Sequence, residues 1–264
     1  MKIIEHPSPN YDSRDGQSVD MLVLHYTGMA SAEQALQRLC DATVKASAHY
    51  MVDEDGTVYR LVPEEMRAWH AGVSFWRGQT NINQRSIGIE MVNPGHEFGY
   101  RAFPEPQMRA VAALCKDVLM RHAIPPRNIV AHSDIAPARK EDPGELFDWK
   151  WLAGQGIGLF PEGEGGASRR VRGCLKEENA SNKIPPHPNT PPHLSDEGLP
   201  GYVIYSSYDG AKAERGRGLE RYGYDTTDPA KAILAFQRHF HPERLSNQWD
   251  AECEALLAEL LAMV

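Results

Sequence analysis

The chain has 264 residues, of which 41% are hydrophobic and 24% are charged, so it is long enough to bury a sizeable core. Its formal net charge of −8 argues against a nucleic-acid-binding protein, whose surface is normally basic. No apolar run reaches the roughly 18 residues that a transmembrane helix needs. The four cysteines lie far apart without a CxxC pair, which argues against disulfides and against a cysteine-based zinc site.

The first part of the chain, residues 1–160, shows strand and helix patterns in alternation. Near-continuous apolar runs indicate buried strands, an Asp-Gly pair indicates a hairpin, and apolar residues at steps of three and four indicate helices. Strands are predicted at residues 19–27, 49–62 (the hairpin), 86–93 and 128–132, and helices at 31–40 and 107–122. This alternation predicts an α/β domain with a mixed central sheet flanked by helices.

The composition changes at about residue 161. Glycines, two basic pairs and the run IPPHPNTPPH leave residues 161–200 with little apolar periodicity, which is typical of a linker or an irregular excursion. Regular patterns return after residue 201, with amphipathic helices expected at 228–240 and 249–263. We therefore expect residues 201–264 to form a small all-helical module.

Three of the apolar strands each carry a polar residue. His25 lies at the end of the first run, Glu90 inside the run at 86–93, and His132 at the end of the run at 128–132. Burying such groups without partners costs a few kcal/mol each. One buried histidine is most often a satisfied core residue. Three strands that each bring a polar group toward one edge of a sheet indicate a functional site.

A polar loop follows His132 and contains Lys140, Glu141 and Asp142 directly before Pro143. Pro143 favours an extended conformation at Asp142. Residues two apart share a side in an extended segment, so Lys140 and Asp142 should point together and Glu141 away. On spacing alone, these three residues are more typical of a solvated turn. Asp134, at the start of the same loop, is expected to form a turn.

Together with the strand residues, this loop offers the parts of a hydrolytic metal site. Two imidazoles and a carboxylate suit zinc, and a fourth position left to water marks a catalytic site. A lysine beside the metal could stabilise charge that develops on a substrate oxygen. Glu90, in an apolar strand, could have a raised pKa and act as general base and then as general acid.

Four motifs occur in order along residues 18–151: LHYTG (24–28), WHAGVSFWRG (69–78), SIGIEMVNPG (86–95) and AHSDIAPARKEDPG (131–144). They resemble the motifs of the zinc-dependent N-acetylmuramoyl-L-alanine amidases of type 2, which share their fold with peptidoglycan-recognition proteins. The resemblance implies that this fold carries one catalytic Zn²⁺. It implies His25, His132 and Asp142 as the metal ligands, with Glu90 and Lys140 as the catalytic pair.

The resemblance implies hydrolysis of the amide bond between N-acetylmuramic acid, or its anhydro form, and the L-alanine of the peptidoglycan stem peptide. The expected partner is therefore peptidoglycan or a muropeptide, and the oligomeric state is left open. The alternative is a recognition protein of the same fold that binds peptidoglycan without cutting it. Such proteins typically lack a zinc ligand, whereas this chain keeps all three candidates, and this favours catalysis.

Substrate contacts are expected from the loops that flank the site. The WHAG segment lines the cleft in the enzymes that this chain resembles, so His70 is a candidate contact. Further side chains that could meet sugar or peptide are Trp76, Arg77, Asn81 and Asn93.

The C-terminal segments AILAFQRHFHP and WDAECEALLAELL resemble the three-helix peptidoglycan-binding modules that are appended to many such amidases. The usual first helix has no obvious counterpart, and the turn that links the helices lacks the frequent glycine, so a structural appendage is the alternative. The first residues contain no recognisable signal peptide, and we expect a cytoplasmic protein. A murein-binding module would instead favour the cell envelope or periplasm.

Overall fold

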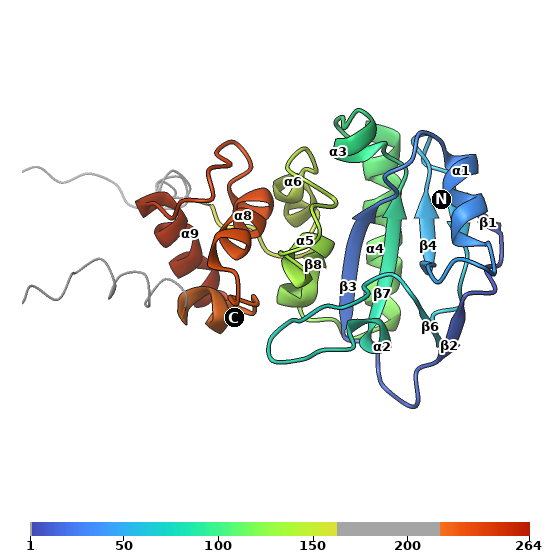
Figure 1. Cartoon of the computed structure of the whole chain (residues 1–264), viewed down its shortest axis with the longest axis horizontal. Coiled ribbons are helices and arrows are strands. Elements are labelled where there is room, and N and C mark those ends of the chain that lie inside the picture. Colours follow the sequence, from blue (N-terminus) through green and yellow to red (C-terminus); the bar gives the residue numbers. More distant parts are fainter. Residues whose placement is uncertain (1, 163–216) are drawn as a thin grey trace, which may run out of the picture. The chain divides into compact units, whose positions relative to one another are not determined.

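The computed structural model describes residues 2–162 and 217–264 (Figure 1). Within these ranges a six-stranded sheet has the order β1-β5-β4-β7-β3-β8, and a two-stranded sheet pairs β2 with β6. The strands are β1 (Ile3–Glu5), β2 (Tyr11–Ser13), β3 (Met21–Tyr26), β4 (Tyr50–Val52), β5 (Val58–Arg60), β6 (Met66–Ala68), β7 (Ser86–Met91) and β8 (Ile129–Ala131). The central strands β4, β7, β3 and β8 run parallel, whereas β4 and β5 form an antiparallel hairpin. The predicted mixed sheet is therefore confirmed.

The hairpin between β4 and β5 turns at Gly56, as its Asp-Gly pair predicts. Gly56 has a φ of +85°, and a Cβ at this position would lie 2.9 Å from the carbonyl oxygen of Pro106. Only glycine meets both conditions at low energy. The strands β1, β2 and β6 were not predicted, because three residues are too few to show a period of two.

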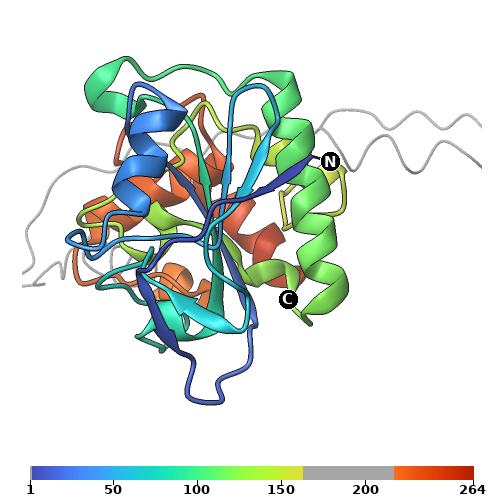
Figure 2. The same ribbon diagram turned by 90° about the vertical axis from the view of Figure 1, so that its right-hand side faces the viewer.

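Helices cover both faces of the sheet (Figures 1 and 2). They are α1 (Ala32–Leu39), α2 (Ile82–Arg85), α3 (Gly95–Phe98), α4 (Glu105–Arg121), the 3-10 turn η1 (Pro126–Asn128), α5 (His132–Ile135), α6 (Trp149–Gly154), α8 (Pro229–Phe240) and α9 (Ala251–Ala262); residues 217–222 are also helical. Ser31 caps the N-terminus of α1, since its side chain accepts from the N–H of Gln34. The helix predicted at residues 107–122 is α4, which starts directly after Pro104.

Side chains along β3 point alternately into two separate hydrophobic clusters, one on each face of the sheet. Leu22 and Leu24 face α4 and pack with Val111 in one cluster. Met21 and Val23 face the other side, where they share a second cluster with the C-terminal helices. His25 continues this second series, so the strand period places it on the face opposite α4.

The C-terminal helices lie beyond the β8 edge of the sheet (Figure 1). Phe236 of α8 and Leu257 of α9 are buried in the same cluster as Val130 of β8, so the described residues up to Pro161 and from 217 belong to one compact unit. The two helices expected at residues 228–240 and 249–263 are present, with Asp228 and Asp250 as their N-caps. Nearly all of the predicted linker, residues 161–200, and the start of the predicted module, 201–216, lie outside the described residues.

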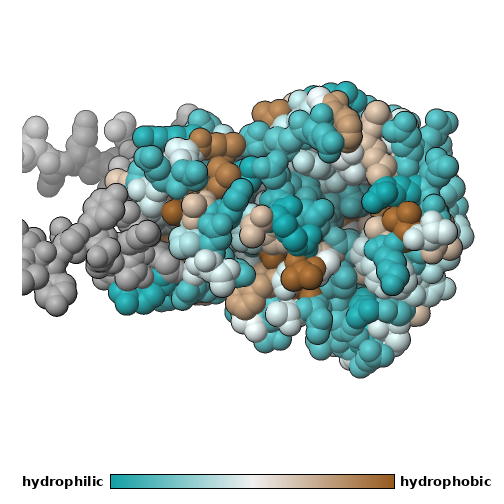
Figure 3. All heavy atoms as spheres, in the orientation of Figure 1, coloured by the Kyte–Doolittle hydropathy of each residue, from teal (hydrophilic) through white to brown (hydrophobic). Residues whose placement is uncertain are grey.

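The surface in Figure 3 is largely hydrophilic, with apolar residues in small separate groups. In the ranges that the structure describes, none of the helices has the length and apolar character of a membrane span.

Candidate active site

His25 and Glu90 lie side by side near the carboxyl ends of two neighbouring strands. The register of the parallel pair β3 and β7 places His25 directly beside Glu90, and partners across a ladder point to the same face. β8 flanks β3 on its other side, and His132 follows it as the first residue of α5. Three parallel strands thus bring the polar residues that the sequence singled out to one edge of the sheet.

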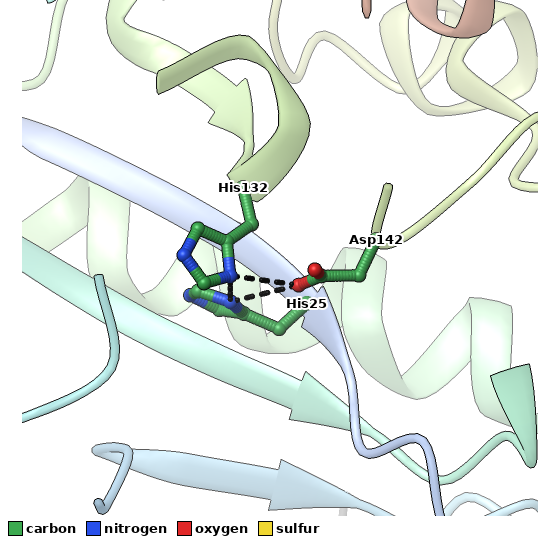
Figure 4. Close-up of side chains that lie close together, drawn as sticks. All are labelled: His25, His132 and Asp142. Carbon is green, nitrogen blue, oxygen red and sulfur yellow. Dashed lines mark hydrogen bonds and ion pairs between the residues drawn. The ribbon is translucent and has the colours of Figure 1, made fainter. Parts of the chain in front are cut away.

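The side chains of His25, His132 and Asp142 converge on one point (Figure 4). The two Nδ1 atoms of the histidines are 2.9 Å apart. Oδ2 of Asp142 lies 3.1 Å from Nδ1 of His25 and 3.0 Å from Nδ1 of His132. All three side chains are buried, with residue exposures of 1%, 3% and 5%.

This arrangement fits a divalent metal ion. Two imidazole lone pairs and a carboxylate oxygen repel one another when they face each other in a buried space, and a cation among them removes that cost. Nitrogen and oxygen ligands of tetrahedral zinc, at bonds of about 2.0–2.1 Å, stand roughly 3.3 Å apart. The observed separations of 2.9 to 3.1 Å are close to that spacing.

The opposite ring nitrogens of the two histidines also have partners. Nε2 of His132 donates to the carbonyl oxygen of Ala71 at 3.1 Å, and Nε2 of His25 lies 2.9 Å from Nδ1 of His70. Burial, and next the neighbouring His132, lower the pKa of His25 to about 4, so this ring is neutral at pH 7. A neutral ring that carries its proton on Nε2 presents a lone pair at Nδ1 toward the cluster.

Asp142 reaches the cluster from the loop after α5. The N–H of Ser133 donates to the Asp142 carbonyl at 3.0 Å and closes this loop. Burial alone would raise the pKa of the Asp142 carboxyl, but the adjacent rings of His132 and His25 outweigh the effect of burial and hold this pKa far below its usual range. The carboxylate is therefore ionised.

A cavity of about 280 Å³ opens onto the cluster, and its wall includes His132, Asp142, Glu90 and Lys140. Glu141 points elsewhere and pairs with Arg238 at 2.8 Å. The alternation of side chains around Asp142 is thus as the sequence predicts.

Glu90 lies partly buried on the cavity wall, and its Oε2 has no hydrogen-bond partner among the described residues. Burial, and next the charge of Asp142, raise the pKa of Glu90 well above its usual value, while the ammonium group of Lys140 opposes this rise. A carboxyl group with a raised pKa can exchange a proton near neutral pH.

Of the predicted substrate contacts, Trp76 and Arg77 lie away from the cavity at the cluster. Trp76 is only 2% exposed, because its ring packs against the rings of Tyr222 and Tyr224. Arg77 donates to the side chain of Asn128 at 3.2 Å. Neither Trp76 nor Arg77 lines the cavity at the His–His–Asp cluster.

Asn93 is fully buried, and its side-chain amide donates to the carbonyl of Arg101 at 2.7 Å. Asn81 stands at the start of α2 in the left-handed conformation. Both residues shape loops around the site and are absent from the cavity wall. His70 does line the cavity, although both of its ring nitrogens already have protein partners.

Asp134 has a larger role than the turn that the sequence indicates. Its Oδ2 does accept from the N–H of Ala131 at 2.8 Å, but the side chain is also fully buried. Oδ1 accepts from the hydroxyl of Tyr224 at 2.7 Å, and Oδ2 contacts Nδ1 of His239 at 2.6 Å. No local pattern could indicate these partners, because they lie 90 and 105 residues away.

Comparisons with known proteins agree with this site. The N-acetylmuramoyl-L-alanine amidase family matches residues 15–145. The N-acetylmuramoyl-L-alanine amidase AmiD of Escherichia coli is 35% identical over 261 residues, which cover 92% of this chain and 82% of AmiD. The 1,6-anhydro-N-acetylmuramyl-L-alanine amidase AmpD of Citrobacter freundii is 33% identical over 161 residues, which cover 54% of this chain and 84% of AmpD.

Two solved structures extend the likeness over the whole chain. The complex of E. coli AmiD with anhydro-N-acetylmuramic acid-L-Ala-D-gamma-Glu-L-Lys has a TM-score of 0.71 at 32% identity and covers 97% of this chain and 92% of AmiD. The complex of AmpDh3 from Pseudomonas aeruginosa with anhydromuramic pentapeptide has a TM-score of 0.69 at 30% identity and covers 97% of this chain and 94% of AmpDh3. Fold, site and relatives define an amide-hydrolysing enzyme. The chain belongs to the N-acetylmuramoyl-L-alanine amidase family.

Proposed function

We propose that this protein hydrolyses the amide bond between anhydro-N-acetylmuramic acid and the L-alanine of the stem peptide, with one zinc ion held by His25, His132 and Asp142. The observation that carries the proposal is the convergence of these three ligand atoms on a cavity that Glu90 and Lys140 also line. The anhydromuropeptides bound in the structures of AmiD and AmpDh3 support this class of substrate.

When bound, zinc would lower the pKa of a water molecule toward neutrality and polarise the scissile carbonyl group. Glu90 would accept a proton from the attacking water as its oxygen adds to the carbonyl carbon. The same carboxyl would then deliver this proton to the alanine nitrogen as the carbon–nitrogen bond breaks. A pKa raised by burial suits both steps, because the group must take up and release a proton at similar pH.

Lys140 would act on the oxygen of the scissile carbonyl. As water adds, negative charge develops on that oxygen, and the ammonium group of Lys140 at the cavity wall would stabilise it. Lysine has no acceptor atom, so Lys140 has no competing role as a base while it is protonated. Lys140→Met should therefore lower kcat more than it raises KM.

The alternative, a protein that binds peptidoglycan without cutting it, is less well supported. This chain keeps all three candidate ligands and both candidate catalytic residues around one cavity. The compartment stays a prediction, with the cytoplasm favoured and the cell envelope as the alternative, and cell fractionation would separate the two.

Incubation of the purified protein with an anhydromuramoyl peptide tests the proposal. Free stem peptide should be released, a zinc chelator should stop the release, and added Zn²⁺ should restore it. Release that persists after complete zinc removal would overturn the metal assignment. Binding of the muropeptide without any release would favour the recognition protein. A parallel reaction with intact murein would show whether the substrate must be the soluble anhydro form.

A further inference from the structure

His70 is a buried histidine that the proposed mechanism does not use. It follows β6 in the loop toward α2 and is 8% exposed. Its Nδ1 lies 2.9 Å from Nε2 of His25, and its Nε2 lies 3.1 Å from the hydroxyl oxygen of Ser86. His70 therefore stands between a candidate zinc ligand and the first residue of β7.

The hydrogen-bond partners of Ser86 determine which ring nitrogen of His70 carries the proton. The hydroxyl of Ser86 lies 2.7 Å from the carbonyl oxygen of Ile82, which can only accept, so the serine proton points there. The serine oxygen must then accept from His70, which places a proton on Nε2 of His70. With that proton on Nε2, the Nδ1 of His70 is the ring's acceptor, and it lies 2.9 Å from Nε2 of His25.

The consequence for His25 is a fixed tautomer. With its single proton on Nε2, the ring of His25 turns the lone pair of Nδ1 toward His132 and Asp142. The opposite tautomer would put a proton among the three ligand atoms and exclude a cation.

The segment that contains His70 and Ala71 also contacts the second candidate ligand, His132. Ala71, the neighbour of His70, accepts from Nε2 of His132 through its carbonyl oxygen. Asn83 holds the two residues in place, because its Oδ1 accepts from the N–H of His70 at 3.1 Å and from the N–H of Ala71 at 2.7 Å. Residues 70 and 71 thus present one acceptor to each of the two ligand histidines.

Gly88 makes room for the ring of His70. A Cβ at this position would lie 2.4 Å from Cγ of His70, so no side chain fits there while the ring keeps its place. Glycine weakens a strand interior, and one that lies between Ile87 and Ile89 in a buried strand indicates close approach of another group. Here that group is the imidazole of His70.

We propose that His70, held by Ser86, is a positioning residue that fixes the tautomer and ring plane of His25 and so organises the metal site before the ion binds. This inference rests on the proposed function, since it takes the cluster to be a zinc site. Outer partners of metal-bound histidines typically change metal affinity by about 10- to 100-fold when they are removed.

Three variants and a matched control test the role of His70. His70→Leu removes the acceptor for His25, whereas His70→Asn can keep an oxygen near the former Nδ1. Ser86→Ala removes the group that orients His70. Ser8→Ala is the control, because its buried hydroxyl also donates to a carbonyl, that of Leu39, but lies outside the cavity at the cluster.

Zinc affinity of the metal-free proteins is measured by competition with a chromogenic chelator, and circular dichroism verifies the fold. We expect affinity to fall about 10- to 100-fold in His70→Leu, less in His70→Asn, a few-fold in Ser86→Ala, and to stay unchanged in Ser8→Ala. A folded His70→Leu protein with wild-type affinity overturns the positioning role and leaves the proposed function intact. If the wild-type protein itself binds no zinc, the proposed function fails as well.

Nitrogen-15 NMR of the histidine rings gives a readout that needs no variant to fold. In the metal-free wild-type protein, His25 should be protonated at Nε2 and bare at Nδ1. A proton found on Nδ1 of His25 contradicts the proposal. In His70→Leu or Ser86→Ala, a mixture of the two tautomers of His25 is the expected result.

Discussion

Two buried clusters of histidine and aspartate meet in α5, and they differ in what completes them. Asp134 faces a donor at each oxygen, with Tyr224 on Oδ1 and both His239 and the N–H of Ala131 on Oδ2. Two positions earlier, His132 faces other acceptors, because its Nδ1 points at the cluster that it shares with Asp142. The Asp134 cluster is complete in protein atoms, whereas the His132 cluster has the donor set of a candidate cation site.

Residue type alone does not separate a structural network from a metal site. Both clusters combine imidazole with carboxylate, and all their side chains are nearly inaccessible to water. The count of donors and acceptors makes the distinction. Where each lone pair meets an N–H or O–H, the group is structural; lone pairs that face one another form a candidate ion site.

The C-terminal helix α8 contacts the segment that carries the active-site residues. His239 lies in α8, and its ring stacks on Trp149 at 3.8 Å while it pairs with Asp134. Arg238 contacts Glu141, the neighbour of Lys140 and Asp142. We propose that α8 braces the loop that carries these residues, whether or not the module also binds murein.

The largest effect is expected for Asp142→Ala. Loss of this ligand should lower kcat/KM on an anhydromuramoyl peptide by on the order of 10⁴-fold and abolish tight zinc binding, because only two histidines would remain. Steady-state kinetics and chelator competition measure the two effects. Activity within tenfold of wild type would show that Asp142 is not a ligand.

The next largest effect is expected for Glu90→Gln, which tests Glu90 as the general base beside the cluster of His25, His132 and Asp142. Removal of a general base should lower kcat by about 10²- to 10⁴-fold while zinc remains bound. In wild-type enzyme kcat/KM should fall on the acid side, since Glu90 loses its function as pH drops through its raised pKa. A pH profile that keeps this limb in Glu90→Gln would assign it to another group.

Glu90→Gln should lower the activity but raise the stability of the metal-free protein at pH 7. A carboxyl whose pKa is raised on folding binds its proton more tightly in the folded state, so its contribution to stability is lost as pH rises from the unfolded pKa through the folded one. At pH 7 Glu90 therefore destabilises the fold, and Glu90→Gln should have the higher melting temperature. Equal melting temperatures at pH 7 would show that burial does not raise this pKa.

Asp134→Ala should act on stability. It leaves Tyr224, His239 and the N–H of Ala131 without their buried acceptor, and we expect a loss of about 3 kcal/mol in the free energy of unfolding. Urea denaturation measures this loss. A variant that keeps wild-type stability but loses zinc would place Asp134 in the metal site and overturn the distinction between the clusters.

The smallest effect is expected for Tyr224→Phe, which removes one hydroxyl and keeps the ring. The loss should be about 1 kcal/mol, because Oδ1 of Asp134 loses one donor. Tyr222→Phe is the matched control, since its ring belongs to the same core cluster. A melting temperature for Tyr224→Phe equal to that of the control would mean that the hydrogen bond to Asp134 contributes nothing.

Much of the site could be predicted from local patterns. Apolar runs placed His25 and His132 at the ends of buried strands and Glu90 inside one, and Pro143 indicated the extended segment in which Lys140 and Asp142 share a side. These predictions depend only on strand period and backbone preference. Both properties are set by residues that are neighbours in the chain.

Other features were decided only by the tertiary structure. Trp76 and Asn93 belong to motifs that suggested substrate contact, yet both turn into the core, because their partners come from other segments. Asp134 lies in α5 and Asp142 in the loop that follows it, and nothing local tells which of them a metal would meet. The answer depends on whether the opposite wall offers donors, as Tyr224 and His239 do, or lone pairs, as His25 does. Only folding brings these distant side chains next to Asp134 and Asp142. Sequence periodicity predicts that a residue is buried but not which residue it contacts.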